Sequence, residues 1–137
     1  MASIFELEQP VFDRMNASVE LVAASDEATT LTAAQSVNSL VVMTPTAGRN
    51  VTTATAAAIV AELGSGVRVG TTFRIILRNQ AAATHAMTLV GGTGVTLDAD
   101  NTNTAAAAST REFIGRVTAI ASGSEAITVY SMPSGTH

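Results

Sequence analysis

The stretch TREFIGRVTAIASGSEAITVYS, residues 110–131, indicates the fold of this chain most directly. β-Branched and apolar residues lie on both sides of SGSE, residues 122–125, whose small and polar side chains are typical of a turn. We therefore predict two strands, residues 110–121 and 126–131, paired as a hairpin. Phe113 is the one large aromatic residue of the first strand, and we expect its ring to lie in the core.

Working outward, residues 72–79 (TFRIILRN) alternate between Phe73, Ile75 and Leu77 on one face and Arg74, Ile76 and Arg78 on the other. Such alternation predicts a half-buried strand with an arginine-bearing outer face. Similar short runs follow turn signals elsewhere, and they predict further strands at residues 37–44, 86–90 and 94–97.

A single helix is expected at residues 54–63, because Ala56, Ile59, Val60 and Leu63 recur with helical spacing. Thr52 or Thr53 is placed to cap its start, and Gly64 to end it.

Short strands with one helix predict an all-β, mainly antiparallel domain, built as a β-sandwich or a jelly-roll-like fold. We expect a single domain at residues 31–131, preceded by an N-terminal arm at 1–30 and followed by a tail at 132–137. The 137 residues suffice for one core.

Composition excludes several classes of partner. Charged residues make up 13% of the chain, all seven basic residues are Arg, and the net charge is −4, so no basic footprint for nucleic acid is present. No apolar run is long enough for a membrane span, and residues 1–10 lack the pattern of an export signal. Synthesis and retention in a cytoplasm is the expectation.

The sequence offers no arrangement typical of an enzyme. His85 reads as a solvated loop residue, and the Asx-rich residues 98–103 lack the Gly and Glu of a calcium loop. Residues 91–94 (GGTG) complete no phosphate-binding motif and read as a tight turn or bulge. We expect no catalytic residue, no cofactor and no metal, and hence a non-enzymatic protein.

The first thirty residues are acidic, with six carboxylates against Arg14. They also carry more large apolar side chains than a solvated tail, which predicts that the arm docks on another protein surface. The alternative interpretation is that the arm completes the sheet of its own chain as a strand. The candidate contacts in the arm are Ile4, Phe5, Leu7, Val11 and Phe12.

Arginine is enriched at protein interfaces, where its planar head pairs with carboxylates. The remaining candidate contacts are therefore Arg49, Arg74 and Arg78, with Arg111 and Arg116 as further possibilities. For each of them, a solvated strand face is the alternative interpretation.

Several blocks, taken in order, resemble the head decoration (capsid cement) proteins of tailed bacteriophages. They span roughly residues 31–131 and read LTAAQ (31–35), TPTAGRNVT (44–52), AAAIV (56–60), VGTTF (69–73), LVGGTGVTL (89–97), REF (111–113) and SEAITVY (124–130).

This resemblance implies a virion protein, made in the host cytoplasm, that trimerises on the outer capsid surface. Its partners would be the major capsid protein and two further copies of itself. The alternatives are another virion component of the neck, tail or fibre base, or a carbohydrate-binding β-sandwich. The last is weak because the chain has no Trp and only Tyr130.

Overall fold

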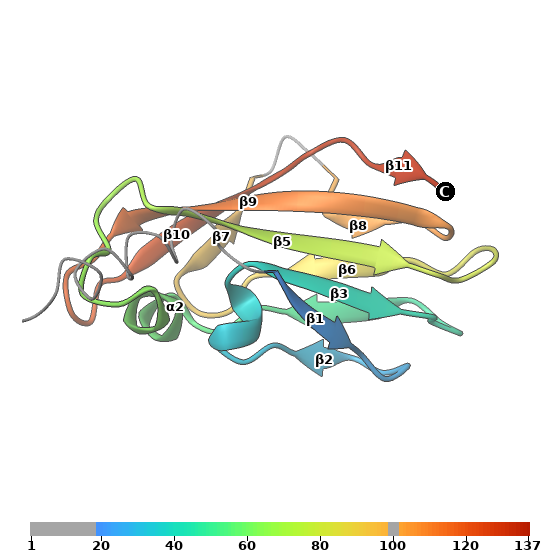
Figure 1. Ribbon diagram of the computed structural model, residues 1–137, viewed down its shortest axis with the longest axis horizontal. Helices are drawn as coiled ribbons and strands as arrows, with labels where there is room; N and C mark the ends of the chain where they lie inside the picture. The colour runs from blue at the N-terminus through green and yellow to red at the C-terminus, as the bar shows by residue number, and fades with distance from the viewer. Residues whose placement is uncertain (1–18, 99–101) are drawn as a thin grey trace, which may run out of the picture.

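The computed structural model describes residues 19–98 and 102–137 (Figure 1). These residues form strands and two short helical segments. The strands are β1 (Glu20–Ala23), β2 (Thr29–Thr30), β3 (Ser39–Met43), β4 (Arg49–Thr52), β5 (Thr72–Asn79), β6 (Met87–Val90), β7 (Val95–Leu97), β8 (Thr104–Ala105), β9 (Ser109–Ala119), β10 (Ala126–Ser131) and β11 (Gly135–Thr136). The helical segments are η1 (Ala34–Ser36) and α2 (Ala56–Leu63).

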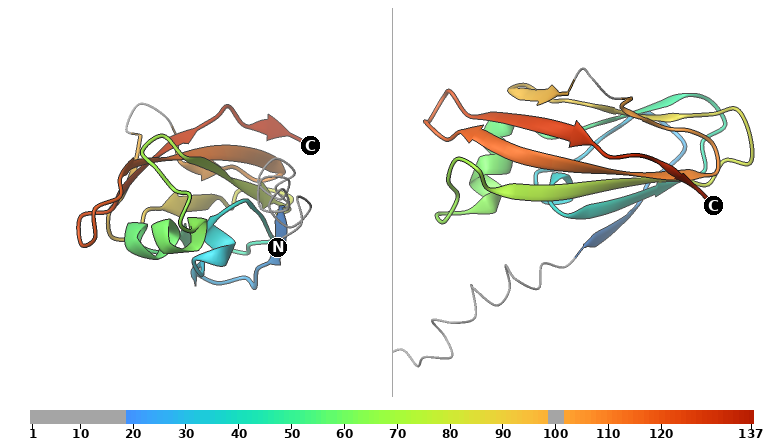
Figure 2. Two further views of the ribbon diagram at one scale, coloured as in Figure 1. Left: turned by 60° about the vertical axis from the view of Figure 1, so that its left-hand side comes forward. Right: turned by 90° about the horizontal axis from the view of Figure 1, so that it is seen from above.

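The strands form two sheets, which lie as two layers in Figure 2. The large sheet has seven strands in the order β1-β3-β5-β9-β10-β7, with β11 also paired to β9. The small sheet has four strands in the order β2-β4-β6-β8. The expected β-rich single domain with one short α-helix is therefore confirmed for the described residues.

The pairing is mixed, and the expected predominance of antiparallel pairs is not confirmed. From β1 to β9, each successive strand lies in the other sheet, and five of the strand pairs, β1–β3, β3–β5, β2–β4, β4–β6 and β6–β8, join strands two apart in the chain. The pairs β1–β3, β3–β5, β2–β4, β4–β6 and β7–β10 are parallel, whereas β5–β9, β6–β8, β9–β10 and β9–β11 are antiparallel.

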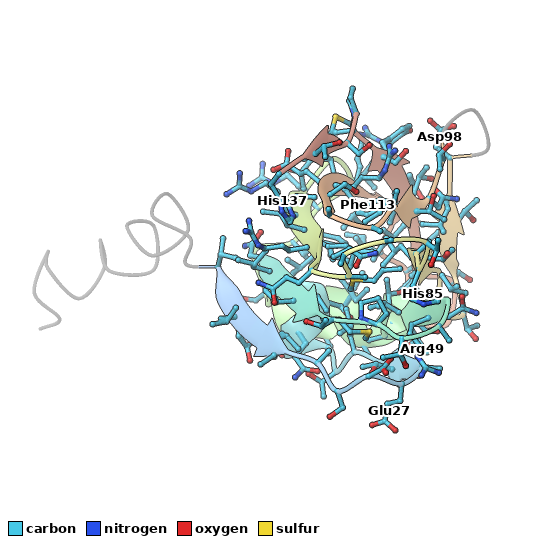
Figure 3. The ribbon with its side chains drawn as sticks, turned by 90° about the vertical axis from the view of Figure 1, so that its right-hand side faces the viewer. Glu27, Arg49, His85, Asp98, Phe113 and His137 are labelled. Carbon is cyan, nitrogen blue, oxygen red and sulfur yellow. The ribbon has the colours of Figure 1, made fainter. Side chains whose placement is uncertain are left out.

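One buried cluster lies between the two sheets. The large sheet contributes alternate residues such as Ile75, Leu77 and Phe113, and the small sheet contributes residues such as Val51 and Leu89. Figure 3 shows Phe113 between the layers. Because side chains of a strand alternate between faces, every second residue of β5 is left on the outer face.

Helix α2 closes one end of the two layers (Figure 1). Ala56 and Ile59 are its buried residues, and Gly64 with φ 84° follows its last turn, as the spacing predicted. The predicted capping residues were wrong: Thr55 is the cap, and its Oγ1 accepts a hydrogen bond from the backbone nitrogen of Ala58 at 3.2 Å. Thr53 is instead buried, and its Oγ1 accepts from Gly92.

The hairpin predicted from residues 110–131 is present as β9 and β10, with Val117 opposite Ile127. The expected boundary at residue 30, however, falls inside the fold. Strands β1 and β2, which the sequence assigned to the arm, pair with β3 and β4, and Val22 of β1 is buried. The expected C-terminal tail likewise includes β11.

Candidate functional site

The outer face of the large sheet carries a group of apolar side chains that are exposed or half-buried. Leu21, Leu40 and Ile76 are cross-strand neighbours on β1, β3 and β5. Ile114 and Tyr130 are neighbours on β9 and β10. Leu21 is 66% exposed and Tyr130 is 39% exposed. We call this surface the outer face; its apolar members are Leu21, Leu40, Val42, Ile76, Ile114 and Tyr130.

Three arginines stand among these apolar side chains. Arg74 lies opposite Ile114, Arg78 lies opposite Val42, and Arg116 lies opposite Thr72. The only acidic residue among them in the described strands is Glu112, so the outer face carries a charge of +3 − 1 = +2. Arg74 and Glu112 form an ion pair, with Nη1 and Oε2 3.4 Å apart and both side chains partly exposed. An exposed pair of this kind adds little stability and leaves both groups available to a partner.

A cavity of about 270 Å³ opens at the α2 end of the same sheet. It is lined by Asn38, Leu63, Gly66, Val67, Arg68, Thr71 and Thr72. Thr72 belongs to β5 and lies opposite Arg116. Asn38 directly precedes β3, and its Oδ1 accepts a hydrogen bond from the backbone nitrogen of Arg74 at 3.0 Å. The cavity therefore adjoins the outer face.

Of the arginines proposed as contacts, Arg74 and Arg78 lie together on the outer face, whereas Arg49 does not. Arg49 is on β4 in the small sheet, where its Nε lies 2.7 Å from Oδ1 of Asp26. Asp26 also accepts hydrogen bonds from the backbone nitrogen and hydroxyl of Thr46. This cluster joins the β1–β2 turn to the β3–β4 turn, which gives Arg49 a structural role.

The Asp26 cluster affects ionisation. The Arg49 guanidinium and then the Thr46 hydroxyl hold the pKa of the Asp26 carboxyl well below its usual range, because each donates a hydrogen bond to the charged form.

Arg111 and Arg116, the two further possibilities, differ in position. The Arg111 side chain donates to the carbonyl oxygens of Thr104 and Met132, at 2.7 and 2.6 Å, and these bonds hold it against the protein itself. Arg116 is exposed on β9. Arg116 therefore joins Arg74 and Arg78 on the outer face, and Arg111 does not.

The arm contacts Ile4, Phe5, Leu7, Val11 and Phe12 lie outside the described residues, as does part of the Asx-rich segment. His85 lies in the β5–β6 loop, and Figure 3 shows it apart from His137. Within residues 19–98 and 102–137, no three His, Asp or Glu side chains are grouped as metal ligands. The same residues include no helix that is long and apolar enough to cross a membrane.

Sequence reasoning missed Leu21, Leu40 and Tyr130 as members of the outer face. Alternation within each strand marks Ile76 and Ile114, but it does not show which strands are neighbours. Leu21 was assigned to the arm, and its place beside Leu40 follows only from the parallel pairing of β1 with β3.

Comparison of the chain with protein-family models, curated proteins and solved structures finds no match. The functional conclusion therefore rests on the surface described above and on the sequence resemblance.

Proposed function

We propose that this chain is a non-enzymatic structural protein of a tailed-phage virion, which binds the outer surface of the major capsid protein lattice and stabilises the head. The observation that carries the proposal is the outer face, where exposed Leu21 and Tyr130 lie among arginines on one continuous sheet. Aromatic residues and Arg are the types enriched in the centres of protein–protein interfaces.

The composition of the chain supports the same role. Only 13% of the residues are charged, about half of the usual share, so much of the surface is neutral and polar. The proposed fold for this role is a β-sandwich, since inward residues from both sheets contribute to one cluster. Because one core joins the two sheets, the outer face is held rigidly. A rigid binding surface suits a protein that holds capsid subunits together against the outward pressure of packaged DNA.

Self-association, most simply as a trimer, is part of the proposal. A core made largely of Val, Ile, Leu and Ala with few aromatic rings buries limited area, and association adds to stability. Light scattering is expected to give a mass near three times 13.9 kDa. A mass of one chain at every concentration would contradict this part.

The test of particle binding uses expanded heads of the encoding phage that lack this protein. Purified full-length chain is added, particles are sedimented, and bound copies are counted by quantitative mass spectrometry. We expect saturable binding at hundreds of copies per head, with higher resistance of decorated heads to heat. A dozen copies or fewer would favour a neck, tail or fibre-base component, and no binding would overturn the proposal.

A matched pair of variants relates binding to the outer face. Tyr130→Ala and Asn50→Ala both remove an exposed side chain, one from the outer face and one from β4 in the small sheet. We expect weaker binding for Tyr130→Ala alone. Equal loss, or no loss, in both variants would remove the outer face from the proposal.

A further inference from the structure

The positive charge of the outer face limits which protein segments can bind over it. Arg74, Arg78 and Arg116 outnumber Glu112, so two outer faces brought together would place +2 opposite +2. Like charges in close opposition are destabilising. The exposed apolar side chains nevertheless favour a cover that excludes water. The fitting occupant is a segment that is both apolar and acidic.

Residues 1–18 of the chain have this composition. Glu6, Glu8 and Asp13 against Arg14 give −3 + 1 = −2, equal and opposite to the outer face. The segment also carries Ile4, Phe5, Leu7, Val11 and Phe12. Its residues 5–8 read FELE, so apolar and acidic side chains alternate there. An extended segment with that period presents apolar groups to one side.

The length of the segment fits the distance to be covered. Eighteen residues reach about 60 Å when extended, whereas the longest strand of the sheet, β9 with 11 residues, spans about 36 Å. The segment joins the fold at Val19, next to edge strand β1. It is therefore long enough to cross the outer face of a neighbouring copy.

The cavity beside Thr72 supplies a place for one large side chain of such a segment. Leu63 and Val67 are apolar lining residues of the cavity, and Arg68 adds a further cation to its lining. Buried aromatic anchors in pockets commonly contribute most of the energy of an interface. A cavity of about 270 Å³ is large enough for one aromatic ring.

We propose that residues 1–18 of one copy dock on the outer face and adjoining cavity of a neighbouring copy, so that the copies are linked by exchanged arms. Arg74, Arg78 and Arg116 pair with the carboxylates of the segment, and its apolar side chains cover Leu21, Leu40 and Ile76 on β1, β3 and β5. Tyr130 on β10, beyond β9 in the same sheet, stays available for the capsid. This inference rests on the proposed self-association and not on particle binding.

The chain has no Cys, so single cysteines give a clean test in the full-length protein. Ile76→Cys is activated with a chromogenic aromatic disulfide and mixed with Leu7→Cys, and release of the coloured thiolate reports a link between two different chains. The control partner is activated Asn50→Cys, on the small sheet. We expect release at least tenfold faster for Ile76→Cys than for Asn50→Cys. Equal rates would overturn the inference.

Reversing the charges on the outer face and on the arm, separately and together, provides a second and independent test. Arg74→Glu with Arg78→Glu, and Glu6→Arg with Glu8→Arg, should each shift the chain toward a monomer in sedimentation velocity. The fourfold variant should restore the association. If both double variants and the fourfold variant remain oligomeric, the proposal of self-association stands but the proposal of arm exchange is overturned. A monomeric wild-type chain would overturn both proposals. A double variant Leu7→Cys/Ile76→Cys that forms only an intramolecular disulfide would also overturn the exchange.

Discussion

The side chain of Asn79 binds the two sheets together through Ala105. Asn79 ends β5 in the large sheet, and its Nδ2 lies 3.0 Å from the carbonyl oxygen of Ala105 in β8 of the small sheet. The same nitrogen donates to the carbonyl oxygen of His85 at 2.8 Å, and Oδ1 accepts from the backbone nitrogen of Ala81 at 2.9 Å. A fully buried amide thus satisfies three backbone groups of the loop and the facing sheet.

Replacing Asn79 by Leu should therefore leave those backbone groups without partners. Each buried unsatisfied group costs about 1–3 kcal/mol, so we expect a loss of about 3 kcal/mol or more in the free energy of unfolding. Urea denaturation measures the loss. Asn50→Leu, at an exposed position of β4, is the control and should change stability by about 0.5 kcal/mol or less. Equal effects would contradict the role of Asn79.

Phe113→Ala tests the core between the layers. The ring is fully buried, and truncation of a buried Phe costs about 3–5 kcal/mol. We expect a clear drop in thermal midpoint by calorimetry. Tyr130→Ala, on the outer face of the same sheet, should have a much smaller effect. An unchanged midpoint for Phe113→Ala would place the ring outside the core.

Gly115 and Phe73 lie opposite each other on β9 and β5, and the Phe73 ring occupies the space that a side chain at position 115 would need. Gly115→Ala should consequently overpack this site and cost about 1–3 kcal/mol. Phe73→Leu shortens the obstructing side chain, so the double variant should lose less than the sum of the single losses. Strict additivity in denaturation experiments would show that the two residues do not compete for space.

The Asp26 cluster predicts a contribution to stability that depends on pH. The folded-state pKa of Asp26 is lowered, so its contribution is fully present above the unfolded value of about 3.9 and is lost as pH falls toward the folded value. Asp26→Asn should therefore lower stability at pH 7 and flatten the decline of stability below about pH 4. Thermal midpoints measured from pH 7 to pH 2 test this. Glu27→Gln is the adjacent control, and an identical decline in wild type and Asp26→Asn would contradict the prediction.

Two N-terminal deletions separate the arm from the fold. Removing residues 1–18 leaves every described strand in place, so at dilutions at which the wild-type chain is monomeric the thermal midpoint should change little. Removing residues 1–30 also deletes β1, β2, Val22 and Asp26, and burial of the Val22 side chain alone contributes about 1.5 kcal/mol or more. At these dilutions only the longer deletion should lower the midpoint, whereas at higher concentrations the deletion of residues 1–18 should also lose the stability that association adds. Equal midpoints would show that β1 and β2 contribute nothing to stability.

The sequence by itself determined the local structure of this protein. Alternation in residues 72–79 predicted β5 with its bounds, and the turn at 122–125 predicted the β9–β10 hairpin, because both signals arise from neighbouring residues. Helical spacing predicted α2 for the same reason. Which of Thr52, Thr53 and Thr55 caps the helix depends on where the chain turns into it, and local spacing does not specify that position. Composition likewise indicated a weakly charged, β-rich chain.

Only the tertiary structure decided which strands are neighbours. Alternation assigns the residues of a strand to two faces, but it does not specify the sheet to which the strand belongs. The short connections between strands led us to predict antiparallel pairing of consecutive strands. The chain instead changes sheet at each connection up to β9, which makes several pairs parallel and draws residues 20–30 into the fold. The outer face exists because this pairing sets Leu21 beside Leu40 and Leu40 beside Ile76, so that one face joins residues up to 55 positions apart whose proximity no local pattern encodes.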